Sequence, residues 1–148
     1  MKKQEYIYRE ILYQVFEKNV RVQTQASLAK TFKISLSTVN SAIKKIEKMG
    51  AIVINPRNFH VQDPKKIVYF WASIRNLSKE IIYATRVNSP IREIEKQVPQ
   101  TSIFGAYSAY KFRFKDVPAD YSEVYIYDTQ EINKRFPPKT GPANLYIL

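Results

Sequence analysis

Residues 27–52 constrain the fold of this chain more than any other stretch, because their apolar spacing predicts two helices joined by a turn and followed by the first strand of a hairpin. Thr24 carries a side-chain oxygen that can cap a helix over residues 25–32. One face of that helix is apolar and carries Leu28, Ala29 and Phe32. This pattern predicts a short helix packed on a neighbour through a single face.

The turn after this helix spans residues 33–35. Ile34 is expected to fill the space between the helices, and the hydroxyl of Ser35 can cap the next helix. Lys33 stands where such turns often carry glycine. Because a left-handed backbone costs free energy at a residue with a Cβ atom, we expect a looser turn than usual.

The next helix is predicted from Ser35 to Met49 by a continuous apolar stripe. The stripe consists of Leu36, Val39, Ala42, Ile43, Ile46 and Met49. Gly50 is expected to end the helix in a left-handed conformation. The helix should therefore bury one face along its whole length.

The opposite face of this helix is polar and basic. Its centre carries Ser37, Ser41, Lys44 and Lys48, with Asn40 and Lys45 on its shoulders. Hydroxyl and amide groups at the N-terminal end followed by lysines suit a helix in the major groove of DNA, where the first residues meet base edges and later cations meet phosphates. Solvated charge is the alternative interpretation, and the unit would then be a protein-interaction module.

A β-hairpin is predicted after Gly50, with strands over residues 51–54 and 59–62 and a turn over 55–58. Arg57 lies at the tip, where its guanidinium could enter the minor groove or meet a phosphate. It could equally serve solubility alone.

Residues 24–62 resemble the winged helix-turn-helix domains of small prokaryotic transcriptional regulators. The resemblance implies a DNA-binding domain of three helices and a β-hairpin wing. The candidate DNA-binding residues are Ser35, Ser37, Thr38, Asn40, Ser41, Lys44, Lys45, Lys48 and Arg57. We expect two such domains in a homodimer to read half-sites on double-stranded DNA.

Charge agrees with a polyanionic partner, since 24 basic and 13 acidic residues give a net charge of +11. The excess is shared, with 11 basic and 5 acidic residues in 1–64 and 13 and 8 in the rest. Membrane headgroups are a competing polyanion, but no basic amphipathic segment or lipidation motif is present. No long apolar run or signal-like start is visible, so we expect a soluble, cytoplasmic protein without membrane contact.

Few residues could carry catalysis. The chain has no cysteine, which excludes disulfides and thiolate sites. His60 is the single histidine and falls in a predicted strand, where a structural role is expected. We therefore expect no metal site, no cofactor and no catalytic residue in this chain.

A helix over residues 4–18, with Ile7, Ile11 and Val15 on one face, should precede the motif. We place the domain boundary at Asp63-Pro64, giving domains 1–63 and 64–148, because Asp can cap a helix that begins with Pro. The helix that follows is unusually apolar, with Ile67, Val68, Phe70, Trp71 and Ile74. It is expected to be buried between the two halves or across a dimer.

The second half is predicted to be a small α/β domain with a mixed sheet, so the whole chain is assigned to the α+β class. Strands are predicted over residues 81–87, 124–127 and 144–148. Helices are predicted over 89–97, 103–112 and 129–135, with a turn-rich loop over 136–142.

The segments 103–112, 120–128 and 144–148 are similar to the nucleotidyltransferase-like domains attached to winged helices in antitoxins of abortive-infection systems and in related archaeal regulators. Active members place a Gly-Ser pair at the helix start and an Asp-x-Asp pair on the next strand, where it holds two magnesium ions. Here Ala106 follows Gly105, and Tyr125 stands where the second acid would follow Glu123. A third acid beyond the last strand is also absent from this sequence. Two-metal phosphoryl transfer needs paired carboxylates, so we expect a non-catalytic relative that serves dimerisation, partner binding or ligand sensing.

One further cluster of this half is aromatic and basic, and it could stack a base or pack as ordinary core. It comprises Tyr107, Tyr110, Tyr121, Tyr125 and Tyr127 with Lys111 and Arg113. Taken together, the sequence predicts a sequence-specific double-stranded DNA-binding transcriptional regulator, with an antitoxin-like repressor as one form. The alternative is a nucleotidyltransferase-fold enzyme or a nucleotide-sensing protein with a DNA-binding module.

Overall fold

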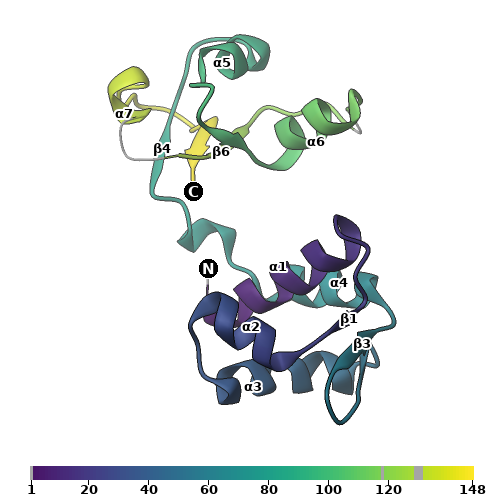
Figure 1. Cartoon of the computed structure of the whole chain (residues 1–148). Helices are drawn as coiled ribbons and strands as arrows, with labels where there is room; N and C mark the ends of the chain where they lie inside the picture. The colour runs from purple at the N-terminus through teal and green to yellow at the C-terminus, as the bar shows by residue number, and fades with distance from the viewer. Residues whose placement is uncertain (1, 118, 129–131) are drawn as a thin grey trace. The chain divides into compact units, whose positions relative to one another are not determined.

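The computed structural model describes residues 2–117, 119–128 and 132–148 and divides the chain into two compact units (Figure 1). Unit 1 is Met1–Asn76 and unit 2 is Leu77–Leu148. Both combine helices with one β-sheet, so the α+β assignment is confirmed. No helix within the described ranges is long and apolar enough to cross a membrane.

The described residues of unit 1 place four helices and a small sheet around one core. Its elements are α1 (Lys3–Phe16), β1 (Val22–Gln23), α2 (Gln25–Phe32), α3 (Leu36–Lys48), β2 (Ile52–Ile54), β3 (Phe59–Val61) and α4 (Pro64–Ile74). The strands form an antiparallel sheet in the order β1-β3-β2. The strand β1 was not predicted, because two residues are too few to show an alternating pattern.

The predicted N-terminal caps of α2 and α3 are confirmed. The side chain of Thr24 accepts a hydrogen bond from the Ser27 N–H at 3.0 Å, and that of Ser35 accepts one from the Thr38 N–H at 3.2 Å. Gly50 has φ +66° and ends α3 as expected. Lys33 also adopts the left-handed conformation, with φ 51° and ψ 46°. The expectation of a loose turn at Lys33 was therefore wrong.

The core of unit 1 contains most of the predicted stripe of α3, namely Val39, Ala42, Ile43 and Ile46. Leu36 is an exception, because 56% of its surface is exposed. It belongs to the first turn of α3, which extends beyond the hydrophobic core. The prediction that Leu36 is buried was wrong.

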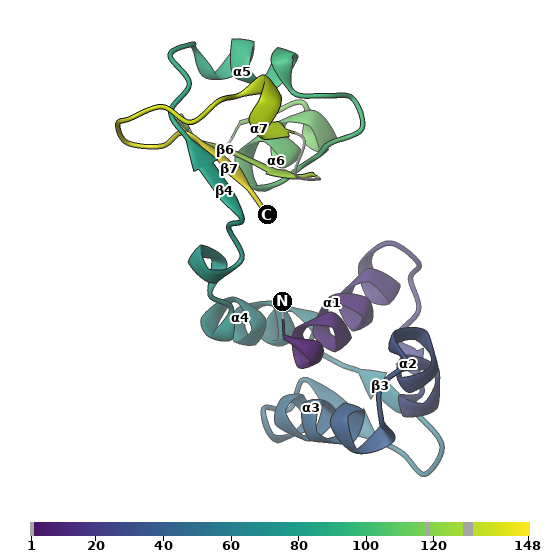
Figure 2. The same ribbon diagram turned by 90° about the vertical axis from the view of Figure 1, so that its left-hand side faces the viewer.

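The apolar helix α4 packs within unit 1, beside α1 (Figures 1 and 2). Ile67 is fully buried, and Phe70 and Trp71 pack partly buried against the same core, with the ring of Phe70 edge-on to Tyr8 at 5.5 Å. The unit therefore ends after α4, at Asn76, and Asp63-Pro64 begins its last helix. The other side of α4 is exposed and carries Val68, Tyr69 and Ile74.

Unit 2 has a mixed four-stranded sheet in the order β4-β7-β6-β5, as the predicted mixed sheet requires. Only β6 and β7 run parallel. Its elements are the 3₁₀ helix η1 (Leu77–Lys79), β4 (Tyr83–Thr85), α5 (Ile91–Gln97), β5 (Ile103–Phe104), α6 (Ala106–Phe114), β6 (Val124–Tyr127), α7 (Ile132–Arg135) and β7 (Leu145–Ile147).

One face of this sheet is covered by α5, and alternation along the strands divides the two faces. The buried core comprises Ile94, Val98, Val124, Ile126, Ile132, Phe136, Leu145 and Ile147. Between the buried residues, Tyr125 of β6 and Tyr146 of β7 alternate onto the other face and stack with ring centroids 4.8 Å apart. Unit 2 therefore has a core of its own.

Several predicted elements of unit 2 differ in extent, and the strand expected over 81–87 is only β4, Tyr83–Thr85. Residues 103–104 pair with β6 as strand β5, and the helix expected over 103–112 begins only at Ala106. The predicted helix over 129–135 is α7, Ile132–Arg135, and residues 129–131 lie outside the described residues. Isoleucine and phenylalanine at 103–104 suit either state, so the strand follows from its partner β6.

Candidate nucleic-acid interface

The polar face of α3 is accessible. Ser37, Ser41, Lys44 and Lys48 are exposed, and Asn40 is half-buried at the edge of the same face. Within the part of the chain that the structure describes, neither Lys44 nor Lys48 has an ion-pair partner. Two hydroxyls, one amide and two ammonium groups therefore face solvent along one side of a single helix.

Two of the predicted site residues hold the start of α3. The hydroxyls of Ser35 and Thr38 lie 2.9 Å apart, and the Thr38 N–H donates to the Ser35 oxygen. This cap fixes where α3 begins and how its N-terminal end is presented. Ser35 is exposed and Thr38 is half-buried, so the hydroxyl of Ser35 has the better access to a ligand.

Lys45 lies on the opposite shoulder of α3 from Asn40, and its ammonium donates a hydrogen bond to Gln4 Oε1 of α1 at 2.7 Å. Sequence spacing alone could not reveal this long-range partner. The exposed Leu36 flanks the side of Asn40, and sequence reasoning missed it because it extends the apolar repeat of the buried stripe. An exposed methyl group at the start of such a helix can contact the methyl group of thymine.

The hairpin β2–β3 places Arg57 at its tip. Its turn is closed by the Asn55 N–H, which donates to the Asn58 carbonyl at 2.8 Å, and by a side-chain hydrogen bond between the same residues at 3.0 Å. A hollow of about 150 Å³ lies between this turn and the start of α2, where it is lined by the cap residue Thr24 and by Gln25 and Ala26. The guanidinium and the N-terminal end of a helix both favour an anion there.

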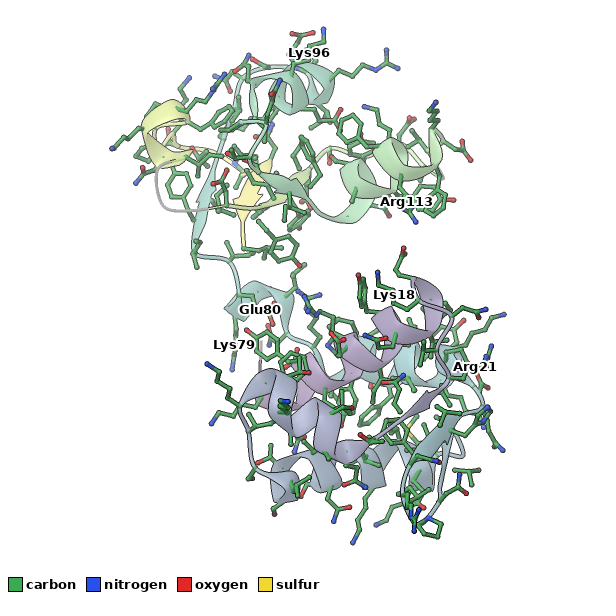
Figure 3. The ribbon with its side chains drawn as sticks, viewed as in Figure 1. Lys18, Arg21, Lys79, Glu80, Lys96 and Arg113 are labelled. Carbon is green, nitrogen blue, oxygen red and sulfur yellow. The ribbon has the colours of Figure 1, made fainter. Side chains whose placement is uncertain are left out.

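The edge of the hairpin sheet is held by Arg21, which Figure 3 labels beside β1. Its guanidinium donates to the carbonyl of Val61 at 3.2 Å and to that of Gln62 at 3.4 Å. These contacts tie the segment before α2 to the end of β3.

The positive charge is concentrated in unit 1. With the boundary at Asn76, unit 1 has 14 basic and 5 acidic residues, a net charge of +9, whereas unit 2 has 10 and 8, a net charge of +2. The even distribution inferred from a boundary at residue 64 depended on Lys65, Lys66 and Arg75, which belong to unit 1. Most of the excess positive charge therefore belongs to the unit that carries α3.

In unit 2, the position expected to carry a second metal-binding acid is filled by Tyr125. Its hydroxyl donates to Glu123 Oε2 at 2.8 Å. Burial and the adjacent Glu123 carboxylate raise the pKa of Tyr125 to about 12, so it stays neutral. Gly105 lies next to this pair, with its N–H donating to the Tyr125 carbonyl at 2.7 Å. The Tyr125 hydroxyl and the Glu123 carboxylate are thus hydrogen-bonded to each other.

The aromatic and basic cluster of unit 2 is arranged around a buried acid that sequence reasoning missed. Glu95 of α5 is buried and accepts hydrogen bonds from Lys111 Nζ and the Tyr121 hydroxyl, both at 2.5 Å. Burial alone would raise the pKa of Glu95, but these donors and the charge of Lys111 outweigh burial and lower it. Tyr107 stacks on Tyr121 at 5.6 Å. The network joins α5 to α6.

The remaining tyrosines of the predicted cluster lie elsewhere. Tyr110 packs against Phe114 within α6, and Tyr125 stacks on Tyr146 of the sheet. These ring contacts therefore divide the predicted cluster into separate groups. They do not join its tyrosines into one surface.

Comparison with known proteins gives no match to any family model, curated protein or solved structure. A function for this chain must therefore be argued from its own surface.

Proposed function

We propose that unit 1 is a winged helix-turn-helix domain and that the protein is a transcriptional regulator that binds double-stranded DNA in a sequence-specific manner. The order of elements supports this proposal: helix, short strand, two helices joined by a left-handed turn, and a hairpin that pairs with the short strand. The observation that carries it is the coincidence of the accessible polar face of α3 with the +9 unit.

In this proposal α3 enters the major groove with Ser37, Asn40 and Ser41 toward base edges. Lys44 and Lys48, one and two turns further on, meet phosphates, and the charge-assisted contacts set the register on the duplex. Arg57 at the hairpin tip reaches the adjacent minor groove or its phosphates. Ser35 and Thr38 position the end of α3 through the cap.

A second copy of the chain would supply a second α3, and a homodimer would read two half-sites about 34 Å apart. We propose that unit 2 contributes to dimerisation or to binding a protein partner, and not to catalysis. Its support is the hydrogen bond from the Tyr125 hydroxyl to Glu123, in which a phenol stands at the position expected for the second carboxylate. Incubation with labelled nucleoside triphosphates and DNA, RNA or protein acceptors should leave nothing labelled; labelling that is lost in Glu123→Ala would favour the enzyme alternative.

The test of DNA binding is selection of bound sequences from random duplexes, followed by affinity measurements over a range of salt concentrations. Lys44→Ala and Lys48→Ala should each reduce the slope of log affinity against log salt by about one. Lys45→Ala should reduce the slope less, because its ammonium donates a hydrogen bond to Gln4. Asn40→Ala should relax the preference for one base while the salt slope stays unchanged.

Three outcomes would contradict the proposal. The first is no binding to any duplex at low salt. The second is equal loss of affinity in Lys44→Ala, Lys45→Ala and Lys48→Ala, which would indicate diffuse charge. The third is a selected pool without any shared sequence, which would indicate non-specific coating of DNA.

A further inference from the structure

A second candidate site is a hollow of about 170 Å³ at the surface of unit 2. Its polar lining consists of Arg86, Asn88, Ser89, Gln97, Arg135 and Lys139. None of the described residues that line it is acidic. Three cationic side chains and three neutral residues with donor groups thus surround one small space.

The walls of this hollow are held by buried polar side chains. The hydroxyl of Thr85 donates to the carbonyl of Pro137 at 3.0 Å and accepts from the Lys139 N–H at 3.1 Å. The hydroxyl of Tyr83 donates to the carbonyl of Phe136 at 2.6 Å. Thr85 is only 2% exposed, and it fixes the 136–139 loop against β4.

The opposite wall is fixed in the same way. The buried side chain of Asn144 accepts from the Val87 N–H at 2.8 Å and donates to the Val87 carbonyl at 3.0 Å. These two bonds hold the segment that leads from β4 into α5. Both walls are therefore pinned by long-range hydrogen bonds, so the cations meet at a defined place although they come from three segments of the chain.

The charges of the hollow are unbalanced. Arg86 donates to a neutral carbonyl, that of Pro142, at 3.5 Å. Among the described residues, neither Arg135 nor Lys139 has an acidic partner. Unit 2 has nearly as many acids as bases, so three cations around one space without an acid are not a consequence of its composition. An anion in the hollow would relieve their mutual repulsion.

We propose that this hollow binds the phosphate group of a small phosphorylated ligand. The guanidinium groups of Arg86 and Arg135 offer planar pairs of N–H donors that fit phosphate oxygens, and Lys139 adds a point charge. Ser89, Asn88 and Gln97 supply neutral donors. The volume accommodates a phosphate group, and the remainder of the ligand extends outside the hollow. The site is in unit 2, so its test does not depend on whether unit 1 binds DNA.

The test uses the whole chain and isothermal titration with inorganic phosphate, adenosine monophosphate and adenosine. Phosphate and the monophosphate should bind, and adenosine should not. Arg135→Ala and Lys139→Ala should each weaken binding by about tenfold or more, and Arg86→Lys should weaken it by less than Arg86→Ala because the charge is kept. Lys96→Ala is the control, since Lys96 projects from α5 (Figure 3) and pairs with Glu93 at 2.8 Å.

The outcomes separate the sources of the phosphate. No binding of phosphate or monophosphate at millimolar concentrations overturns the proposal, as does equal weakening by Lys96→Ala. A duplex that competes with phosphate, together with loss of DNA affinity in Arg135→Ala, would assign the hollow to the DNA backbone and also overturn the small-ligand proposal. Circular dichroism of each of these variants shows whether it remains folded.

Discussion

The indole N–H of Trp71 donates a hydrogen bond to Glu5 Oε2 across 3.3 Å and so joins α4 to the first turn of α1. Glu5 is 3% exposed, and its other oxygen accepts the backbone N–H of Lys2 at 3.2 Å. A buried carboxylate needs such donors, because an unsatisfied one loses its hydration without compensation. The hydrogen bond therefore links α4 to α1 within unit 1.

Replacing Trp71 by Phe removes the donor but keeps an aromatic ring, and it should lower the free energy of unfolding of unit 1 by about 1–3 kcal/mol. Trp71→Ala should lower it by about 3 kcal/mol or more, because the ring is also lost from the core. Guanidinium unfolding followed by circular dichroism measures both. Tyr69→Ala on the exposed side of α4 is the control; if it costs as much as Trp71→Phe, the contact with Glu5 has no special role.

The cap of α3 gives a prediction that separates stability from DNA binding. Ser35→Ala should destabilise unit 1 by about 1 kcal/mol, because the Thr38 N–H loses its acceptor. Ser35→Asp keeps an acceptor at this position and should preserve stability, while its negative charge lowers DNA affinity. Fluorescence of Trp71, the single tryptophan, reports the unfolding of unit 1. Ser37→Ala should leave stability unchanged; an equal loss there would contradict the capping role.

The left-handed residue at the helix turn predicts a stabilising substitution. Lys33 has φ 51°, a conformation that costs a residue with a Cβ atom about 1–2 kcal/mol. Lys33→Gly removes that cost, although the unfolded chain gains freedom, so unit 1 should become more stable by about 0.5–1 kcal/mol. Lys30→Gly, inside α2, should instead destabilise by about 1 kcal/mol. A decrease in stability for Lys33→Gly would show that the turn is not strained.

The network at Glu95 predicts the response of unit 2 to acid. The pKa of Glu95 is lower in the folded protein than its ordinary value, so its stabilisation is complete above the unfolded pKa. It is lost as the pH falls through the folded pKa. Urea unfolding of unit 2, followed by the circular dichroism of its tyrosines across the acidic range, should show this loss, and Glu95→Gln should flatten it. Glu93→Gln, on the exposed side of α5, should leave the profile unchanged.

The same network also makes the stability of unit 2 depend on pH in the alkaline range, through Lys111. The hydrogen bond to Glu95 raises the pKa of Lys111, although burial opposes it. The stabilisation by Lys111 is therefore complete below its unfolded pKa and is lost as the pH rises through the folded pKa. Lys111→Met should remove this alkaline component and also lower stability at neutral pH, because it leaves the Glu95 carboxylate buried with one donor fewer.

The part of the fold made by contacts between residues close in the chain could be predicted from the sequence alone. The Thr24 and Ser35 caps, the stripe from Val39 to Ile46 and the stop at Gly50 depend on neighbours three or four positions away, or on the residue's own backbone. Each of these was predicted correctly. The exposed face of α3 follows from the same geometry, because residues opposite the stripe must point outward.

The tertiary structure decided what depends on partners far away in the sequence. Trp71 could have faced unit 2 or a second chain, and its bond to Glu5, 66 positions away, placed α4 in unit 1. That assignment placed Lys65, Lys66 and Arg75 in unit 1 and so raised the net charge of the unit that carries α3. The convergence of Arg86, Arg135 and Lys139 likewise depends on Thr85 and Asn144 holding distant loops. Such contacts leave no periodic pattern in the sequence. Their partners meet only when the chain folds, and closing the loop between them costs conformational entropy.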